Sequence, residues 1–209
     1  MKMLYALAEK VGVFLYRRGY WIINQAARLK NGGEHPKHAI MHYHEFFIKN
    51  VKKGQTILDV GCGDGYVAWH VANKAKKVIG IDMDPQKLRL AKKKYVKDNL
   101  IYINGDATNY QFKTKIDTVI LSNVLEHIKH RVALLKKLPA AKTFLVRVPL
   151  ITRDWLAAYL KEQGYDYRLD RTHYLEYTEP MIREELTKAG LHIRKTEVRW
   201  GEIYVVATK

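Results

Sequence analysis

Short apolar runs alternate with helical segments through residues 56–149, and this alternation limits the fold more than any other feature of the chain. Five strands are predicted, at 56–60, 77–82, 100–105, 117–122 and 142–149. Runs this short, rich in β-branched residues and bounded by polar turns, are typical of strands buried on both faces. Strands that alternate with helices form a parallel sheet with right-handed crossovers. The sequence therefore predicts a doubly wound α/β protein.

Two regions lie outside this alternation. The last two apolar runs, 192–200 and 202–209, are separated only by Gly201, which predicts an antiparallel hairpin at one edge of the sheet. The result is a mostly parallel, seven-stranded, Rossmann-like sheet. Upstream, 4–30 is predicted as one amphipathic helix or two short ones, and 36–50 as a further helix. We therefore divide the chain into two parts: an N-terminal helical extension that covers the active site, 1–50, and a Rossmann-like domain, 51–209.

Charge and cysteine content restrict the class of protein. A formal net charge of +16 predicts affinity for an anionic partner, such as nucleic acid, a membrane surface or a phosphorylated substrate, although a lysine-rich proteome would also explain it. Cys62 is the single cysteine, which excludes a disulfide framework and favours a cytoplasmic location. Charged residues interrupt 4–30, so we expect neither a transmembrane helix nor a signal peptide there.

A glycine-rich turn follows the first predicted strand. Asp59 is followed by Gly61, Gly63 and Gly65 in the stretch DVGCGDG. Doubly wound sheets bind ligands at the carboxyl ends of their strands, and glycine lets a ligand approach the main chain closely. Tyr66 stands where the dinucleotide fingerprint requires its third glycine. The turn is therefore predicted to hold a ligand that lacks a pyrophosphate group.

The next three strands also end in polar residues. Asp82 ends the second strand and is placed to accept both hydroxyls of a ribose. Asp106 follows the third strand, next to Ala107, where a carboxylate and nearby amides can read an adenine edge. Ser122 and Asn123 end the fourth strand. Four consecutive strand ends with polar residues predict one site for a nucleoside.

This ordered set resembles the class I S-adenosylmethionine-dependent methyltransferases, closest to the small-molecule branch called type 11 or type 23, over roughly 50–208. The resemblance implies S-adenosylmethionine as the cofactor. It also implies the roles of the cofactor-binding residues. The glycine loop and Asp59 would hold the methionine part of the cofactor, and Asp82 would hold the ribose. Asp106 and Ala107 would contact the adenine. Ser122 would lie at the end of the fourth strand, and Tyr43 or His44 would close over the carboxylate.

Glu126 and His127, in the stretch LEHI, are the first candidates for acceptor chemistry. The pair resembles the Glu-His segment of methyltransferases that act on quinone-precursor catechols or RNA 3′ ends, where it helps to hold a divalent metal. The upstream Glu of those enzymes falls on Asn123 here, so the match is incomplete and no metal is predicted. The alternative of a metal held by Glu126 and His127, with His173 as a further ligand, is left open. His127 is instead a candidate general base, or a residue at a helix start that packs against the cofactor.

A second candidate region is the stretch DRTHYLEYT. It resembles a segment of type 23 members, which implies that Asp170, Thr172, His173 and Tyr177 lie at the acceptor pocket. His173 is thus a second catalytic candidate. The alternative is that Thr178 caps the next helix and His173 only braces the loop.

These features predict a methyltransferase that acts on a small-molecule acceptor, by O-methylation of a sugar, a quinone precursor or a lipid-linked intermediate. The alternatives are an RNA methyltransferase and a nonenzymatic S-adenosylmethionine-binding partner protein. The chain has SNVL where base-amino methyltransferases carry their Pro-Pro loop, which disfavours RNA bases as acceptors. Peripheral contact with an anionic membrane or nucleic acid is left open, as is the oligomeric state.

Overall fold

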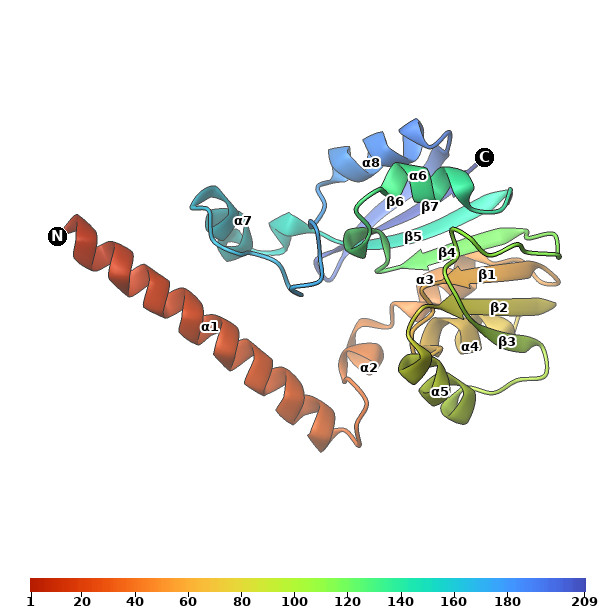
Figure 1. The fold of residues 1–209 in the computed structure, drawn as a ribbon, viewed down its shortest axis with the longest axis horizontal. Coiled ribbons are helices and arrows are strands. Elements are labelled where there is room, and N and C mark those ends of the chain that lie inside the picture. The colour runs from red at the N-terminus through yellow and green to blue at the C-terminus, as the bar shows by residue number, and fades with distance from the viewer. The chain divides into compact units, whose positions relative to one another are not determined.

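A computed structural model describes the backbone of residues 1–209 and every side chain except that of Lys2 (Figure 1). The chain forms two compact units, Met1–Tyr43 and His44–Lys209, and each is described by itself. No helix in the described part of the chain is both long enough and apolar enough to cross a membrane.

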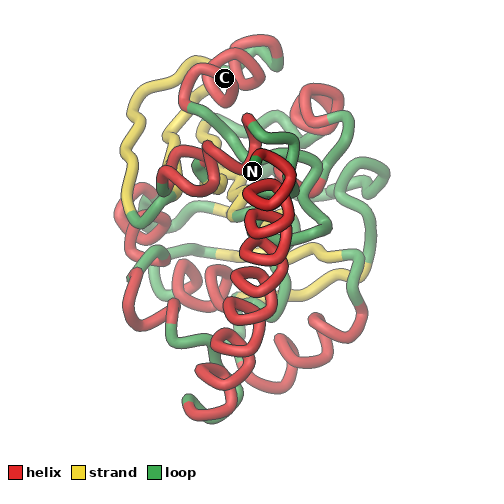
Figure 2. Tube along the Cα trace, turned by 90° about the vertical axis from the view of Figure 1, so that its left-hand side faces the viewer, coloured by secondary structure: helices red, strands yellow, loops and turns green.

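The N-terminal unit consists of two helices. The first, α1 (Lys2–Lys30), is a single unbroken helix of 29 residues, as Figure 2 shows. It ends where the amide of Gly33, in the left-handed region, donates to the carbonyl of Arg28 at 2.8 Å. The second helix, α2 (Lys37–Met41), follows Pro36. His42 then takes a left-handed conformation, with φ of 45°, so the helix predicted over 36–50 is interrupted there.

The second unit is built on a seven-stranded sheet, with the order β3-β2-β1-β4-β5-β7-β6. Its strands are β1 (Thr56–Val60), β2 (Lys77–Asp82), β3 (Leu100–Asn104), β4 (Thr118–Ser122), β5 (Thr143–Pro149), β6 (His192–Arg199) and β7 (Glu202–Thr208). The first five strands are parallel, whereas β7 runs antiparallel to both of its neighbours. The predicted fold class is confirmed, including the antiparallel hairpin at the C-terminal edge (Figure 1).

Because the order steps outward from β1 to β3 and then returns to β4, the sheet has a switch point between β1 and β4. Their carboxyl ends lie side by side, since Val60 pairs with Leu121 in register, and β2 joins the same edge through Val60 and Ile81. All five residues of β1 are buried. The crevice that doubly wound folds use for ligands is therefore placed at the ends of these strands.

The second unit contains six α-helices. They are α3 (His44–Asn50), α4 (Tyr66–Ala72), α5 (Pro85–Lys94), α6 (Arg131–Lys137), α7 (Trp155–Glu162) and α8 (Glu179–Lys188). α3 packs on α4, and α5 lies on β2 and β3, whereas α6 pairs with α8, which contacts β6 (Figure 1). Asp84 and Thr178 cap α5 and α8 through their side chains.

The sequence also predicts a helix over about 124–138 with a kink near Lys129. The structure interrupts the helix there: a short 3₁₀ turn, η1 (Leu125–His127), is followed after three residues by α6. Asn123, just before η1, takes a left-handed conformation with φ of 55°. The sharp turn keeps Glu126 and His127 close to the end of β4 rather than carrying them away along a helix.

Candidate active site

The glycine loop after β1 is the first part of the site. All three of its glycines have positive φ. A Cβ at Gly61 would lie 2.7 Å from a methyl of Val124, so no larger residue fits there without a shift. A Cβ at Gly63 would have no atom within 4 Å, so the main chain at Gly63 faces open space. The loop therefore packs tightly at one glycine and leaves room for a ligand at the next.

Asp82 is tied directly to this loop. Its Oδ2 accepts a hydrogen bond from the amide of Gly63 at 2.8 Å, and its Oδ1 accepts one from the amide of Asp84 at 2.8 Å. Each carboxylate oxygen retains acceptor capacity for one further donor. The predicted ribose acid thus lies at the open side of the glycine loop, with its orientation fixed by two backbone amides.

Asp59 lies on β1, near the carboxyl end of that strand. Its side chain is buried, and Oδ2 has no hydrogen-bond partner among the described residues. Burial raises the pKa of Asp59 to about 8, and the nearby Asp82 carboxylate contributes in the same direction. Such a group is neutral near pH 7 and would ionise when a cation approaches. It is chemically suited to an ammonium group.

The remaining predicted cofactor residues form their contacts away from the glycine loop. Asp106 follows β3, and its carboxylate accepts from the amide of Thr108 at 2.8 Å and from the side chain of Asn109 at 3.0 Å. Ala107 packs against the hydrophobic core. Ser122 ends β4 and accepts from the Arg147 guanidinium at 3.2 Å. Tyr43 belongs to the N-terminal unit, where its hydroxyl lies 2.6 Å from His38 Nδ1.

Two polar groups lie beside these residues, and the sequence analysis did not predict the first of them. Arg147 on β5 forms a buried ion pair with Glu202 on β7, with 2.7 Å between Nη2 and Oε1. The sequence signal was a charged residue in the middle of the apolar run FLVRVP. Next to the glycine loop, the His44 and His70 rings stack at 4.1 Å, and the Tyr66 hydroxyl lies 3.1 Å from His44 Nδ1.

Glu126 is the most deeply buried candidate on the acceptor side. Its side chain on η1 is fully buried, and neither carboxylate oxygen has a hydrogen-bond partner within the described chain. Burial raises the pKa of Glu126 to about 8. A buried carboxyl group without a partner is costly and is found mainly at functional sites. Glu126 is therefore a neutral carboxylic acid near pH 7.

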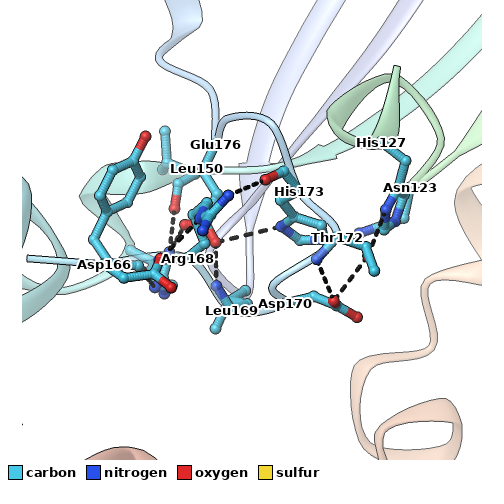
Figure 3. A network of polar contacts seen from close by, with 12 residues as sticks. Asn123, His127, Leu150, Asp166, Arg168, Leu169, Asp170, Thr172, His173 and Glu176 are labelled. Carbon is cyan, nitrogen blue, oxygen red and sulfur yellow. Dashed lines mark hydrogen bonds and ion pairs between the residues drawn. The ribbon is translucent and has the colours of Figure 1, made fainter. Parts of the chain in front are cut away.

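His127 is held by a chain of hydrogen bonds from a distant segment. The Thr172 hydroxyl donates to Asp170 Oδ1 at 2.8 Å, and Thr172 Oγ1 also lies 2.9 Å from His127 Nδ1 (Figure 3). Since the single hydroxyl proton goes to Asp170, His127 Nδ1 is the donor toward Thr172, which leaves Nε2 with its lone pair. Burial lowers the pKa of His127, and His173 contributes to this shift.

His173 lies beside His127. The two rings are 4.6 Å apart and meet edge to face, and His173 is buried (Figure 3). The amide of Tyr174 donates to the carbonyl of Glu126 at 2.7 Å, which joins the two segments. One ligand atom each from Glu126, His127 and His173 lies within 4.8 Å of the other two. The spacing could admit a divalent cation, so the prediction of a site without metal stays a prediction.

A buried ion pair fixes the segment 165–178. Glu176, whose side chain is fully buried, bonds to the Arg153 guanidinium and to the amide of Leu169 (Figure 3). Arg168 donates to the carbonyl of His173 at 2.6 Å. By contrast, Tyr177 lies in the hydrophobic core, where its hydroxyl donates to Glu185 at 2.8 Å. The predicted placement of Tyr177 at the acceptor pocket is therefore wrong, whereas Asp170, Thr172 and His173 do meet His127.

Comparison with known proteins agrees with this architecture. Residues 57–142 match a family described as a methyltransferase domain. N-methyltransferase 4 of Papaver somniferum is 26% identical over 174 residues, which cover 72% of this chain and 49% of that protein. The mitochondrial ubiquinone biosynthesis O-methyltransferase of Schizosaccharomyces pombe is 33% identical over 89 residues, 40% of this chain and 32% of that protein. The chain thus spans about half the length of the first of these relatives and a third of the second.

Solved structures share the fold. Magnesium protoporphyrin IX methyltransferase from Synechocystis, with bound SAH, superposes with a TM-score of 0.64 at 19% identity, covering 80% of this chain and 82% of that one. A Haloferax volcanii methyltransferase complex with the Trm112 activator gives a TM-score of 0.67 at 16% identity, covering 82% and 91%.

The fold, the glycine loop and the match over residues 57–142 agree with the predicted class I S-adenosylmethionine-dependent methyltransferase domain.

Proposed function

We propose that the protein transfers a methyl group from S-adenosylmethionine to a hydroxyl of a small-molecule acceptor, with His127 Nε2 as the general base. The observation that carries this proposal is the hydrogen-bond chain from Asp170 through Thr172 to His127 Nδ1, which leaves Nε2 free to take a proton. The lowered pKa of His127 supports it, because the ring is then neutral and ready to act near pH 7.

We propose for the cofactor-binding residues the roles that the resemblance implies, and the geometry of the sheet edge supports them. The buried carboxyl of Asp59 would ionise against the cofactor ammonium, and the open main chain at Gly63 would take the methionine part. Asp82 would accept the ribose hydroxyls beside that loop. Asp106 with Ala107 would meet the adenine, and Ser122 would lie at the end of β4. That Tyr43 closes over the carboxylate, and that residues 1–50 cover the active site, stay predictions.

In the proposed reaction the acceptor oxygen attacks the methyl carbon in line with the breaking bond to sulfur. The acceptor proton passes to His127 Nε2, and the electron pair of the broken bond stays on sulfur, which gives S-adenosylhomocysteine. Most of the catalysis comes from positioning the two reactants. Glu126, as a neutral acid, and His173, against the His127 ring, would hold the acceptor side.

The acceptor classes that we propose are a sugar, a quinone precursor or a lipid-linked intermediate. The similar proteins include both N- and O-methyltransferases, so they do not decide between nitrogen and oxygen as the acceptor atom. The proposal of oxygen therefore depends on the presence of a general base. A neutral amine attacks through its own lone pair and can lose its proton afterwards, whereas a hydroxyl gains from a base in the transition state. A free His127 Nε2 therefore favours oxygen. An RNA acceptor, suggested by the net charge of +16, would show binding that weakens steeply with salt.

The experiment is a turnover assay with labelled S-adenosylmethionine against hydroxyl acceptors, amines and RNA. With a hydroxyl acceptor, His127→Gln should lower kcat by about 10²–10⁴-fold, because the base is lost. The cofactor Kd should change less than about twofold, since His127 lies on the acceptor side. His130→Gln, an exposed histidine three positions on, is the matched control and should keep full activity. Undiminished turnover of His127→Gln on a hydroxyl acceptor would contradict the proposal.

A further inference from the structure

The least explained surface of the molecule is one face of α1. Large apolar side chains spaced three and four residues apart share this face and are exposed: Leu4 (66%), Leu7 (59%), Val11 (48%), Phe14 (57%), Trp21 (59%) and Ile22 (57%). Nothing in the methyltransferase chemistry uses them. We refer to these six residues as the α1 apolar face. An exposed apolar surface of this extent marks an interaction site.

The opposite side of α1 faces the rest of the N-terminal unit. Asn24 Oδ1 lies 2.6 Å from His35 Nε2, so the segment after the helix returns to that side. The α1 apolar face is left uncovered within the unit. Gly12 and Gly19 also lie in this helix, and each weakens it by about 1 kcal/mol relative to alanine. A helix with such interior glycines depends on a surface against which its apolar face can pack.

Charge distinguishes between the surfaces that could cover this face. Exposed basic residues lie along the helix at Lys10, Arg18, Arg28 and Lys30, and the only acidic residue among residues 1–30 is Glu9. Trp21 and the tyrosines of α1 are of the type enriched where apolar and aqueous regions meet. Basic residues with large apolar and aromatic side chains on one long helix are typical of helices that lie in the plane of an anionic bilayer surface.

Arg18 argues against a parallel pair of α1 helices, from two copies of the chain, as the covering surface. It continues the line of Leu4, Leu7, Val11 and Phe14 at the same spacing, so it falls inside the apolar face. Its guanidinium lies 5.4 Å from the centre of the Phe14 ring. A parallel helix pair would bring two Arg18 side chains together, which is repulsive. At a bilayer surface the long side chain can reach lipid phosphates while its stem stays among apolar groups.

We propose that α1 docks the protein in the plane of a membrane that contains anionic lipid. The α1 apolar face enters the acyl boundary, and the basic residues, Arg18 included, contact lipid phosphates. This interaction does not depend on the methyl transfer proposed above and can be tested without any acceptor.

The test is flotation of the full-length protein with vesicles of phosphatidylcholine, with and without 30% phosphatidylglycerol. The partition coefficient should be at least about tenfold higher with the anionic lipid and should fall as salt is raised. Ile22→Asn should lower it by about fivefold or more. Ile23→Asn is the matched control, because Ile23 is equally apolar and exposed, at 68%, but lies off the face; it should change partition less than about twofold.

Several results would overturn the docking proposal. One is the absence of flotation with anionic vesicles at low salt, and another is an equal effect of the two isoleucine substitutions. A concentration-dependent dimer that Ile22→Asn dissociates would mean that a second copy covers the face. A fall in thermal stability with Ile22→Asn alone, without vesicles, would mean that the face packs inside the protein.

Arg18→Gln should weaken binding to anionic vesicles by about threefold and leave binding to neutral vesicles unaffected. An unchanged affinity for the anionic vesicles would contradict the assignment of Arg18.

Discussion

The two halves of the candidate active site are built in different ways. The cofactor half is made by backbone: three glycines within five residues shape the loop, and the Gly63 amide orients Asp82. The acceptor half is made by side chains from segments 45 positions apart, where Thr172 meets His127, and a buried ion pair holds one of these segments. The first half joins turns that follow adjacent strands, with Gly63 and Asp82 19 positions apart, whereas the second depends on contacts between more distant segments. The two should therefore respond separately to mutation.

Among the predicted mutations, Glu176→Gln should show the largest difference between its effects on the acceptor half and on the cofactor half. The substitution leaves the Arg153 guanidinium without its buried counter-charge, which typically costs about 3–5 kcal/mol of unfolding free energy. Denaturant unfolding measures this loss, and acceptor turnover should fall with it. The cofactor Kd should change less than about twofold, because the glycine loop shares no contact with Glu176.

Glu184→Gln is the matched control for that experiment. Glu184 is exposed and pairs with Lys188 at 2.6 Å on the surface of α8, where such ion pairs contribute little to stability. Equal losses of stability in the two variants, or loss of cofactor binding in Glu176→Gln, would show that the halves are not independent.

A second prediction concerns protons on the cofactor side. Asp59 has a pKa of about 8 in the folded protein, whereas an unfolded Asp ionises near pH 3.9. The folded protein without cofactor thus holds one proton more than the unfolded chain between these values. This group therefore lowers the unfolding free energy as pH rises through that window, by up to about 1.4 kcal/mol per pH unit. The cofactor ammonium favours the ionised form, so binding at pH 7 should release close to one proton.

Calorimetric titration in buffers with different ionisation heats measures that proton directly. The affinity should rise up to about tenfold per pH unit below pH 8 and then level off. Asp59→Asn should abolish the dependence on buffer and pH. An unchanged proton count in that variant would contradict the assignment of Asp59 to the ammonium group.

The smallest effect expected is on the acceptor side. Thr172→Val keeps the shape of the side chain but removes the acceptor for His127 Nδ1–H, a hydrogen bond that contributes about 1 kcal/mol. The value of kcat should fall about fivefold with cofactor affinity unchanged, and Thr172→Ser should restore it. The rate of the wild type should fall only at pH below the ordinary histidine range, because burial lowers the pKa of His127. Full activity of Thr172→Val, with a loss in Thr172→Ser, would indicate that Thr172 acts through packing alone.

The difference between the halves also explains what the sequence could predict. Local patterns predict the strands, the doubly wound arrangement of the sheet, the glycine loop and Asp82. Turn residues and hydrophobic periodicity can each be recognised within a few residues of sequence. The turn at η1 was predicted only as a kink near Lys129, since the run 124–138 has helical periodicity and only the left-handed Asn123 and the tertiary contact from Tyr174 break it. Tyr177 was misplaced because a motif gives spacing but not the direction of a side chain.

Contacts made at long range were the hardest to foresee. The Arg147–Glu202 pair joins two strands 55 positions apart, and Glu176 reaches Arg153 over 23 positions. Single charged residues in apolar runs were the only visible signals. The contact between Thr172 and His127 was predicted only as a shared pocket and not as a hydrogen bond.

The most direct test of the central claim is calorimetric titration with S-adenosylmethionine and, separately, with NAD, for the wild type, Asp82→Ala and Asp84→Ala. Asp84 is the matched control, because it lies two positions away and caps α5 rather than facing the glycine loop. We predict micromolar binding of S-adenosylmethionine to the wild type. Asp82→Ala should bind it at least about hundredfold more weakly, because two charge-assisted hydrogen bonds are lost. The Kd of Asp84→Ala should change less than about threefold. The absence of S-adenosylmethionine binding, or a preference for NAD, would contradict the account.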